Sequence, residues 1–331
     1  MALCLVTGAC GFMGTHMVEV LAQAGHQVRA TDLKASYDRD DWQVGRFPSV
    51  LKKLDVEFLP SDVTHQESMR PLFQGVECVF HIAAIFNYAI PWEALYRVNV
   101  QGTQNLLELI AEAPSFKKLV LWGAGGIYDF SNRNSHTFVI DEDSPKNPIN
   151  NYLRSKWEQE QLVANFCRSK GLRFSVIRPT TVYGPRAIYG GGQLITDALK
   201  MKKLMVPKNF TFKIPTIHVR DVCRSALHLA MTEATDGQAY NVNDDSVTPT
   251  VEFMRMMAEI TGRRFKLLPP VPVGLVAWIL KVVAIVGAWR KKIFGGRPAK
   301  FAVDMIKLFG LDISYQNGKL KTIESKKARN I

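Results

Sequence analysis

The sequence has few cysteines, and none of them stand in the close pairs that bind metals or form compact disulfide frameworks. Its 331 residues contain five scattered cysteines, at Cys4, Cys10, Cys78, Cys167 and Cys223. The seven histidines also lack the spacing of metal ligands. We therefore expect free thiols in a reducing compartment, no disulfide framework and no metal ion.

The chain also lacks a low-complexity tract and a secretory leader. It is 47% hydrophobic and 22% charged, which is ordinary for a globular protein and excludes a disordered one. The first residues, MALCLV, have no basic segment before them and lead directly into a glycine-rich turn. We therefore expect the fold to begin at the start of the chain, without a signal peptide.

Acidic residues are in the minority, and the formal net charge is +12. No segment combines aromatic residues with a dense basic stripe, so this charge does not predict nucleic-acid binding. The basic residues gather late, in WRKKIFGGRPAK and KLKTIESKKARN. A basic tail beside an apolar stretch favours an anionic membrane surface as partner, and ordinary solvated charge is the alternative.

The N-terminal segment has the order of a nucleotide-binding unit. An apolar stretch of strand length, ALCLVT, is followed at once by Gly8, Gly11 and Gly14. A helical pattern follows, FMGTHMVEVLAQAG, with Gly25 as its C-cap, and the next strand, QVRATD, ends at Asp32. The three glycines would allow a tight turn, close approach of a pyrophosphate and close helix packing. This order of elements predicts a dinucleotide site at the helix N-terminus.

Asp32 stands 18 residues beyond Gly14, where a carboxylate would bind the adenine-ribose hydroxyls. The same carboxylate would repel a 2′-phosphate, so we expect NAD rather than NADP as the cofactor. Arg29 and Lys34 lie close by in the sequence and act against this preference.

The same alternation of strand and helix continues along the chain. VEFLPSD, VECVFHIAA, KKLVLWG and LRFSVIRP have the pattern of strands, and WEALYRVNVQGTQNLLELIAEA that of a long amphipathic helix. This order predicts an α/β fold, a Rossmann-type doubly wound parallel sheet that binds its ligands at the C-terminal edge of the strands. We expect an NAD-binding domain over 1–180 and a smaller C-terminal substrate-binding domain over 181–331, with part of 215–245 packed back on the first.

The segment NNYLRSKWEQEQ places Tyr152 and Lys156 four positions apart, on one face of a helix. The spacing alone fits a solvated helix face equally well. A tyrosine with a pKa of about 10 is a poor base at neutral pH. An ammonium group about 4 Å away supplies on the order of 4 kcal/mol at an effective dielectric constant of about 20, enough to bring that pKa to about 7. The pair could therefore take a hydroxyl proton.

The segments TGACGFMG, SDVT, HIAA, VNVQGTQN, YLRSK, RPTTVYGP and IHVRDV occur in the order found in the extended short-chain dehydrogenases/reductases, which the chain resembles over about residues 3–245. The resemblance implies that Tyr152 is the catalytic acid/base and that Lys156 is its partner and holds the nicotinamide ribose. It implies a structural role for Asn99. It also implies a cofactor site lined by Gly8, Gly11, Phe12, Met13, Gly14, Asp32, Asp62, Val63 and Ala83, with Tyr152, Lys156, Pro179 and Thr180 around the nicotinamide.

The chain departs from the family pattern at Ala124. Family members carry a serine or threonine four residues before the tyrosine that corresponds to Tyr128, and its hydroxyl would bond the substrate oxygen. Sugar-nucleotide members also carry asparagine in the RPTTVYGP segment, where this chain has Thr181. The Arg178-Pro179 pair of the same segment is more similar to the branch of steroid, sterol-carboxylate and flavonoid reductases, which weakens the nucleotide-sugar interpretation.

Residues 271–289 form an apolar run with one charge, Lys281. As a helix the run would be about 28 Å long, nearly the thickness of a bilayer core, but a central lysine makes spanning marginal. The pattern favours a helix that lies in the membrane interface or covers an apolar pocket. A buried core helix is the alternative.

This run and the later DISYQNGKLK resemble the tail of 3β-hydroxysteroid and sterol-4-carboxylate 3-dehydrogenases. The resemblance implies an NAD-dependent oxidation of the 3β-hydroxyl of an apolar, steroid-like substrate, with decarboxylation where a carboxylate neighbours it. Two alternatives remain: a nucleotide-sugar epimerase or dehydratase, and a catalytically weak dinucleotide-sensing protein. We expect a cytoplasmic protein, peripheral on the cytoplasmic face of a membrane. A homodimer is compatible with the sequence, which does not fix the oligomeric state.

Overall fold

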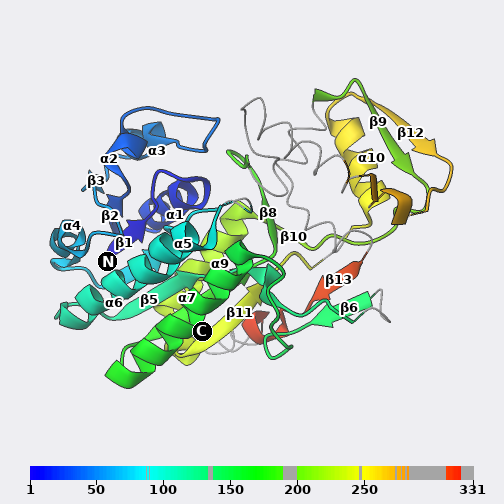
Figure 1. Ribbon diagram of the computed structural model, residues 1–331. Coiled ribbons are helices and arrows are strands. Elements are labelled where there is room, and N and C mark those ends of the chain that lie inside the picture. The colour runs from blue at the N-terminus through cyan, green and yellow to red at the C-terminus, as the bar shows by residue number, and fades with distance from the viewer. Residues whose placement is uncertain are drawn as a thin grey trace, which may run out of the picture.

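The protein is built on a parallel sheet of seven strands in the order β11-β7-β5-β4-β1-β2-β3 (Figure 1). The computed structural model describes residues 1–86, 88, 90–132, 137–188, 200–245, 248–272, 274–276, 278–279, 282 and 311–321. The sheet strands are β1 (Leu3–Thr7), β2 (Gln27–Thr31), β3 (Glu57–Phe58), β4 (Cys78–His81), β5 (Lys118–Trp122), β7 (Phe174–Pro179) and β11 (Gln238–Val242). All neighbouring strands are parallel, so their C-terminal ends share one edge. The predicted Rossmann-type fold is confirmed.

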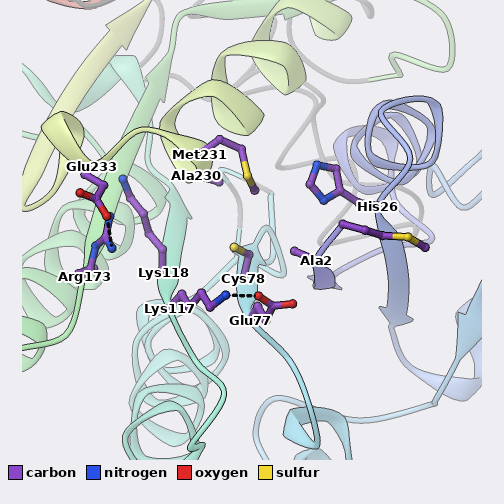
Figure 2. Close-up of a pocket in the computed structure, with 11 residues that line it drawn as sticks. Ala2, His26, Glu77, Cys78, Lys117, Lys118, Arg173, Ala230, Met231 and Glu233 are labelled. Carbon is purple, nitrogen blue, oxygen red and sulfur yellow. Dashed lines mark hydrogen bonds and ion pairs between the residues drawn. The ribbon is translucent and has the colours of Figure 1, made fainter.

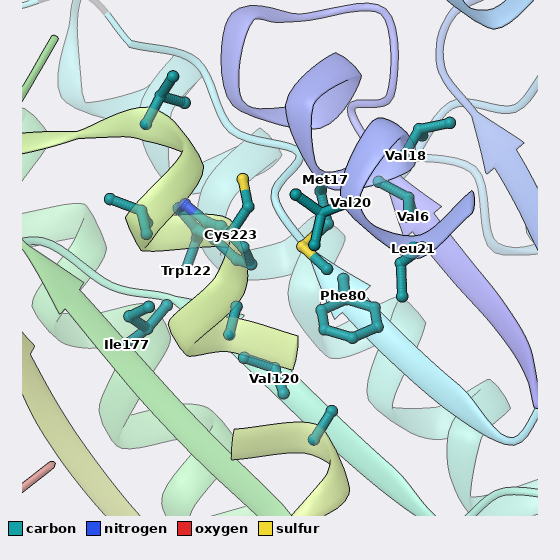
Figure 3. Close-up of a cluster of buried hydrophobic side chains, with 14 of the residues drawn as sticks. Val6, Met17, Val18, Val20, Leu21, Phe80, Val120, Trp122, Ile177 and Cys223 are labelled. Atoms are coloured by element: carbon teal, nitrogen blue, oxygen red, sulfur yellow. The ribbon is translucent and has the colours of Figure 1, made fainter. Parts of the chain in front are cut away.

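The two faces of the sheet follow from the alternation of side chains along each strand. In β5, Val120 and Trp122 belong to one buried cluster, while Leu119 and Leu121 belong to the other. Helices α1 (Phe12–Gln23) and α9 (Val219–Met231) cover the first face, as Figure 3 shows. Helices α6 (Gly102–Glu112) and α7 (Asn151–Lys170) cover the second. The strands are therefore apolar on both faces, as a sheet buried between helix layers requires.

The long helix expected over 92–113 forms as three consecutive segments. These are α5 (Trp92–Leu95), the π-helical η2 (Tyr96–Gln101) and α6. Asn99 lies fully buried in the π-helical segment, and its amide oxygen accepts a hydrogen bond from the backbone of Ile85 at 2.8 Å. Single π-helical turns inside α-helices are frequent at functional sites.

Helix α7 has a defined start and end. The side chain of Asn150 caps its N-terminus by accepting a hydrogen bond from the backbone N–H of Leu153 at 2.9 Å. Gly171 ends it in the left-handed conformation, at φ +64°. Tyr152 and Lys156 consequently lie in the first two turns of the helix.

Three small parallel sheets of two strands each accompany the central sheet in the described part of the chain. β8 (Thr181–Tyr183) pairs with β10 (Thr216–His218), β9 (Lys203–Pro207) with β12 (Arg264–Leu268), and β6 (Thr137–Ile140) with β13 (Asp312–Tyr315). Helix α10 (Thr250–Ile260) packs on β9 and β12, and the three lie to one side of the central sheet in Figure 1. Residues 215–245 also supply β11 to the central sheet and α9 to the helix layer that covers one of its faces. The expected boundary between two domains at residue 180 stays a prediction.

The strand expected over 56–62 is short: β3 spans only Glu57–Phe58. It is an edge strand that pairs with β2 alone, and Pro60, which has no N–H group, follows soon after.

The remaining short helical elements are α2 (Lys34–Tyr37), α3 (Pro48–Lys53), α4 (Gln66–Met69), η1 (Arg70–Phe73), η3 (Gly125–Ile127) and η4 (Glu233–Thr235).

The apolar run 271–289 and the two late basic segments lie mostly outside the described residues. In the described part of the run, Leu275, Trp278, Ile279 and Val282 have between 38% and 61% of their surface exposed. Among the residues that the structure describes, no helix is long and apolar enough to cross a membrane. The expected interfacial helix therefore stays a prediction.

Candidate active site

The three predicted glycines form one tight turn at the end of β1. Gly8 has φ +67°, and a Cβ atom there would lie 2.9 Å from the Cα of Ala83. A Cβ at Gly14 would lie 2.1 Å from the carbonyl oxygen of Gly8, so α1 packs on the turn with no room for a side chain. A Cβ at Gly11 would meet only that same oxygen, at 3.2 Å, among the described residues. The outer side of the turn is therefore open.

Helix α1 begins at this turn without a side-chain cap. Its N-cap is Gly11, and Phe12 and Met13 are its first two residues. Backbone N–H groups of the first turn and the positive end of the helix dipole are therefore available to a ligand. An open glycine turn beside an uncapped helix N-terminus fits the diphosphate of a dinucleotide.

Asp32 follows β2 directly and lies beside the glycine turn. Its two carboxylate oxygens accept hydrogen bonds from the backbone N–H groups of Cys10, at 3.1 Å, and Leu33, at 2.8 Å. Burial raises the pKa of the Asp32 carboxyl, and these two hydrogen bonds partly oppose the rise. The carboxylate is thus fixed at the position where the sequence predicts an adenine-ribose contact.

Arg29 is one of the two cations expected to act against the preference for NAD over NADP, and its guanidinium is already bound within the protein. Its Nε donates to Glu57 at 2.8 Å, and its NH1 donates to the backbone oxygen of Leu72 at 2.8 Å. Arg46, which the sequence analysis did not consider, is the cation whose charge lowers the pKa of Asp32. No local pattern indicates Arg46, because the loop after α2 returns it to the glycine turn, where the backbone N–H of the next residue, Phe47, donates to the Cys10 oxygen at 2.8 Å.

The remaining predicted cofactor residues lie at the same edge of the sheet. They are Asp62 and Val63 after β3, Ala83 after β4, and Pro179 and Thr180 at the end of β7. The backbone N–H of Thr180 donates to β11 at 3.1 Å, which fixes the end of β7. The structure therefore brings these residues to the strand ends where parallel α/β sheets bind ligands. Their roles stay predictions.

Tyr152 lies against two aromatic side chains from the loop after β4. Its ring centroid is 4.8 Å from that of Phe86 and 5.7 Å from that of Tyr88, both in edge-to-face arrangements. Burial raises the pKa of the Tyr152 hydroxyl, and Tyr88 adds to the rise. The lowered pKa expected from the spacing of Tyr152 and Lys156 is therefore wrong. The reason is the apolar surrounding, which disfavours the phenolate.

Lys156 is also buried, with 2% of its surface exposed. Its ammonium group donates a hydrogen bond to the side-chain oxygen of Gln159, one turn further along α7. Burial lowers the pKa of Lys156 to about 7, although the charge of Glu160 opposes the shift. The ammonium therefore contacts an amide and not the Tyr152 phenol. Gln159 is a competing acceptor that the spacing of Tyr152 and Lys156 does not reveal.

Asn99 connects the loop after β4 to the first turn of α7. Its amide nitrogen donates to the hydroxyl of Ser155 at 2.9 Å, and that hydroxyl donates to the backbone oxygen of Tyr152 at 2.7 Å. With the bond from Ile85 described above, these contacts fix the backbone that carries Tyr152. They support the structural role that the resemblance implied for Asn99.

Ala124 lies in the same apolar cluster as Tyr152 and has 9% of its surface exposed. A Cβ at the next residue, Gly125, would lie 2.9 Å from the Pro179 oxygen, so this loop packs closely on the end of β7. The hydroxyl of Tyr315, from β13, donates to the backbone oxygen of Gly125 at 2.5 Å. The loop is therefore fixed from two sides, and its side chain at position 124 carries no hydroxyl.

A buried ion pair that the sequence analysis missed lies behind Lys156. Both Glu160 oxygens accept hydrogen bonds from Arg178, at 3.1 and 2.5 Å, and Arg178 also donates to the Tyr128 hydroxyl at 2.8 Å. The sequence contains one indication of this acid: Glu160 lies four residues after Lys156 and therefore on the same helix face as the lysine. Arg178 stands inside an otherwise apolar strand, which indicates a buried partner.

A depression of about 320 Å³ lies at the opposite end of the strands, between the starts of β1, β4 and β5 (Figure 2). Its lysine and arginine side chains are each paired with an acid. Lys117 pairs with Glu77, Arg173 with Glu233 at 3.0 Å, and the buried Lys118 with Asp236 at 2.6 Å. The depression is separate from the predicted site, and these three charges are neutralised within the protein.

Residues 4–243 match the family described as the NAD dependent epimerase/dehydratase family. The chain belongs to this family. The expected cofactor, NAD, is thereby confirmed at the level of the family, and the protein is an enzyme of the NAD-dependent dehydrogenase/epimerase type. The predicted resemblance to extended short-chain dehydrogenases/reductases is confirmed as well.

Proteins whose names give different activities are similar to this chain. A sterol-4-alpha-carboxylate 3-dehydrogenase, decarboxylating, from Bos taurus is 30% identical over 272 residues, or 80% of this chain and 70% of the relative. An N-acetyl-alpha-D-glucosaminyl-diphospho-ditrans,octacis-undecaprenol 4-epimerase from Escherichia coli O157:H7 is 25% identical, over 82% and 76%. The structure of UDP-glucose 4-epimerase from Thermotoga maritima, solved with UDP-glucose, has a TM-score of 0.66 at 26% identity, over 81% and 86%.

Proposed function

We propose that the protein is an NAD-dependent dehydrogenase that oxidises a secondary alcohol, the 3β-hydroxyl of an apolar, sterol-like substrate. The observation that carries the proposal is the placement of Tyr152 at the C-terminal edge of the sheet, against Phe86 and Tyr88. An aromatic and apolar wall suits a polycyclic hydrocarbon better than a sugar diphosphate. The 30% identity to a sterol dehydrogenase supports the same substrate class.

The residues around the glycine turn would hold NAD. Gly8, Gly11 and Gly14 with the α1 N-terminus would hold its diphosphate, and Asp32 its adenine ribose. Lys156 would hold the nicotinamide ribose. The chemistry that NAD supplies when bound is the acceptance of a hydride from a substrate carbon.

The proton transfer belongs to residues of this chain. Tyr152 would accept the proton of the substrate hydroxyl, and the Lys156 ammonium would stabilise the resulting phenolate. Phe86 and Tyr88 pack edge-to-face against the Tyr152 ring, and the less polar surroundings that they provide would strengthen this electrostatic interaction. Where the substrate carries a carboxylate on the neighbouring carbon, oxidation gives a β-keto acid, which loses carbon dioxide readily.

A substrate panel tests the proposal. Purified protein with NAD is assayed for NADH formation with a 3β-hydroxysteroid, a 4-carboxysterol and a nucleotide sugar. We expect NADH formation with the first two and a loss of about 10²–10⁴ in rate for Tyr152→Phe, because its proton acceptor is removed. The control is Tyr96→Phe, which removes the hydroxyl of an exposed tyrosine. Sterol turnover that survives Tyr152→Phe unchanged would overturn the assignment.

Nucleotide-sugar conversion is the second candidate, because the Thermotoga relative is a UDP-glucose 4-epimerase by name, and the E. coli relative is a 4-epimerase of a sugar diphosphate linked to undecaprenol. In the panel, interconversion of a nucleotide sugar without NADH release would favour this candidate. Thr181, which replaces the asparagine of sugar-nucleotide members, argues against it. A dinucleotide-sensing protein would bind NAD and turn over neither class.

We also propose peripheral association with an anionic membrane from the cytoplasmic side. Its support is the exposed apolar group of Leu275, Trp278 and Ile279, together with the basic residues that follow it in the sequence. Flotation with anionic liposomes tests this: full-length protein should float with them, and salt should release only part of it. A Trp278→Ser and Ile279→Ser double variant should bind less, whereas full-length protein that does not bind anionic liposomes contradicts the proposal.

A further inference from the structure

A continuous chain of buried side chains connects Lys156 to the end of β1. Gln159 is fully buried and lies between the ammonium of Lys156 and the hydroxyl of Thr103. Its side-chain oxygen accepts from Lys156, and its side-chain nitrogen donates to Thr103 at 2.7 Å. An amide has separate donor and acceptor ends, so both of these contacts together fix its orientation.

The contacts of Thr103 fix the direction of the next bond. Its hydroxyl donates to the backbone oxygen of Asn99 at 2.6 Å. A hydroxyl has a single hydrogen, so Thr103 must accept from both other partners, Gln159 at 2.7 Å and the Nε2 of His81 at 2.9 Å. His81 therefore carries its hydrogen on Nε2.

The other end of His81 completes the chain at the glycine turn. With the hydrogen on Nε2, its Nδ1 accepts from the hydroxyl of Thr7 at 2.8 Å. The same Thr7 oxygen accepts from the backbone N–H groups of Ile82 and Ala83, each at 3.1 Å. Burial lowers the pKa of His81 to about 3, with a further contribution from the charge of Lys156. A neutral His81 with one donor and one acceptor nitrogen agrees with this arrangement.

We propose that Gln159 is a positioning residue for Lys156, and that Thr103, His81 and Thr7 anchor it to the end of β1. The inference rests on the proposed function only in that Lys156 serves Tyr152. The chain cannot conduct protons to the lysine, because the Gln159 amide interrupts it. Its effect is to hold the ammonium at one place and to orient a carbonyl dipole toward it.

Gln159 should therefore influence the pH at which Lys156 loses its proton. Burial opposes the charged form, and two neighbouring groups favour it: the Gln159 oxygen and the Glu160 carboxylate, which is paired with Arg178. His81, at the end of β4, faces the ammonium as a neutral group. Removing the amide oxygen should therefore make Lys156 lose its proton at lower pH, and replacing it by a carboxylate should make it lose its proton at higher pH.

The titration of Lys156 in the cofactor-free protein tests this directly. Protein labelled with ¹³C-lysine is titrated by NMR, and the Cε signal of Lys156 is assigned from its absence in Lys156→Arg. Gln159→Met keeps the length of the side chain but removes the acceptor, and we expect the midpoint to fall by about one pH unit or more. Gln159→Glu should raise it by at least as much. The control, Gln161→Met, changes an exposed residue of the same helix and should leave the midpoint unchanged.

Each outcome bears on the proposal. Opposite shifts in the two Gln159 variants support it, and a midpoint that stays at the wild-type value in both overturns it. If Gln159→Met does not fold, Gln159→Glu alone decides, because the expected shift has a definite sign. The measurement needs no turnover, so the failure of the proposed dehydrogenase activity would be seen separately, in the substrate panel. Where the protein is active, the pH profile of kcat should move in the same directions.

Discussion

The carbonyl oxygen of Gly8 lies 2.1 Å from the position that a Cβ atom at Gly14 would occupy. Such a contact is impossible without moving backbone, because the oxygen belongs to the turn and not to a flexible side chain. Gly11, in the middle of the same turn, has an ordinary extended conformation at φ −76°, and a Cβ there would meet the same oxygen at 3.2 Å, a tight contact that a small backbone shift relieves. Gly14 is therefore needed for the packing of α1 on the turn, whereas Gly11 is needed mainly for the approach of a ligand.

Gly14→Ala and Gly11→Ala should separate folding from cofactor binding. We expect Gly14→Ala to lower the free energy of unfolding by about 3 kcal/mol or more, since the helix must move away from the turn. Gly11→Ala should cost clearly less stability than Gly14→Ala, because its methyl group meets the Gly8 oxygen at 3.2 Å and not at 2.1 Å, but it should weaken NAD binding, since the methyl group would occupy the open side of the turn. Urea unfolding and fluorescence titration with NAD measure the two effects. An unchanged urea midpoint for Gly14→Ala would contradict the packing described above.

The wild-type protein should bind NAD more tightly than NADP by about tenfold or more, because the Asp32 carboxylate repels a 2′-phosphate. Asp32→Ser should reduce this ratio, and Asp38→Ser, which changes an exposed acid nearby, should not. Fluorescence titration with both cofactors gives the ratio. Equal wild-type affinities would mean that Arg46 attracts the phosphate strongly enough to override Asp32.

His81 should make the protein sensitive to acid. Burial lowers its folded-state pKa to about 3, whereas the unfolded chain has a pKa of about 6.5, so the unfolded state binds more protons between these values. Stability should therefore fall as pH falls below 6.5, by about 1.4 kcal/mol for each pH unit from this group. Urea unfolding from pH 7 to pH 5 measures the slope. His81→Gln should flatten it, and the exposed His65→Gln should leave it unchanged.

Much of this site could be predicted because its residues are local in sequence. Gly8, Gly14 and Asp32 belong to one strand-turn-helix-strand unit, whose spacing is fixed by the lengths of its elements. Tyr152 and Lys156 are joined by one helical turn. Such local patterns can be recognised in the sequence without knowledge of the fold.

The contacts of these residues could not be predicted, because they come from distant segments. Gln159 meets Thr103, 56 positions away, and Arg178 meets Tyr128, 50 positions away. The spacing of Tyr152 and Lys156 therefore predicts a contact between the two, whereas in the fold Gln159 accepts the hydrogen bond of the ammonium. Burial, which decides the direction of the pKa shifts here, is likewise a property of the assembled fold.

The buried pair of Glu160 and Arg178 should be essential for stability. Both side chains are 5% exposed, so Glu160→Gln leaves an uncompensated charge inside the protein, at a cost of about 3–5 kcal/mol. Glu158→Gln is a matched control on the same helix. It breaks an exposed pair with Arg154, whose contribution is about 0.5 kcal/mol or less. Urea unfolding compares the two variants, and equal small losses would contradict the role of the buried pair.

Ala124 gives the last test, since it leaves the site without the family's substrate-orienting hydroxyl. If Tyr152 and Lys156 carry out the proton transfer, the missing hydrogen bond slows the reaction by about 10²–10³ and leaves the base in place. Ala124→Ser should therefore raise kcat, with little change in NAD affinity, because the new hydroxyl would face the substrate oxygen. The rise should vanish when Tyr152→Phe is added, since the hydroxyl has no proton acceptor to assist. A serine variant no faster than wild type, together with an unimpaired Tyr152→Phe, would mean that α7 presents these two residues for packing alone.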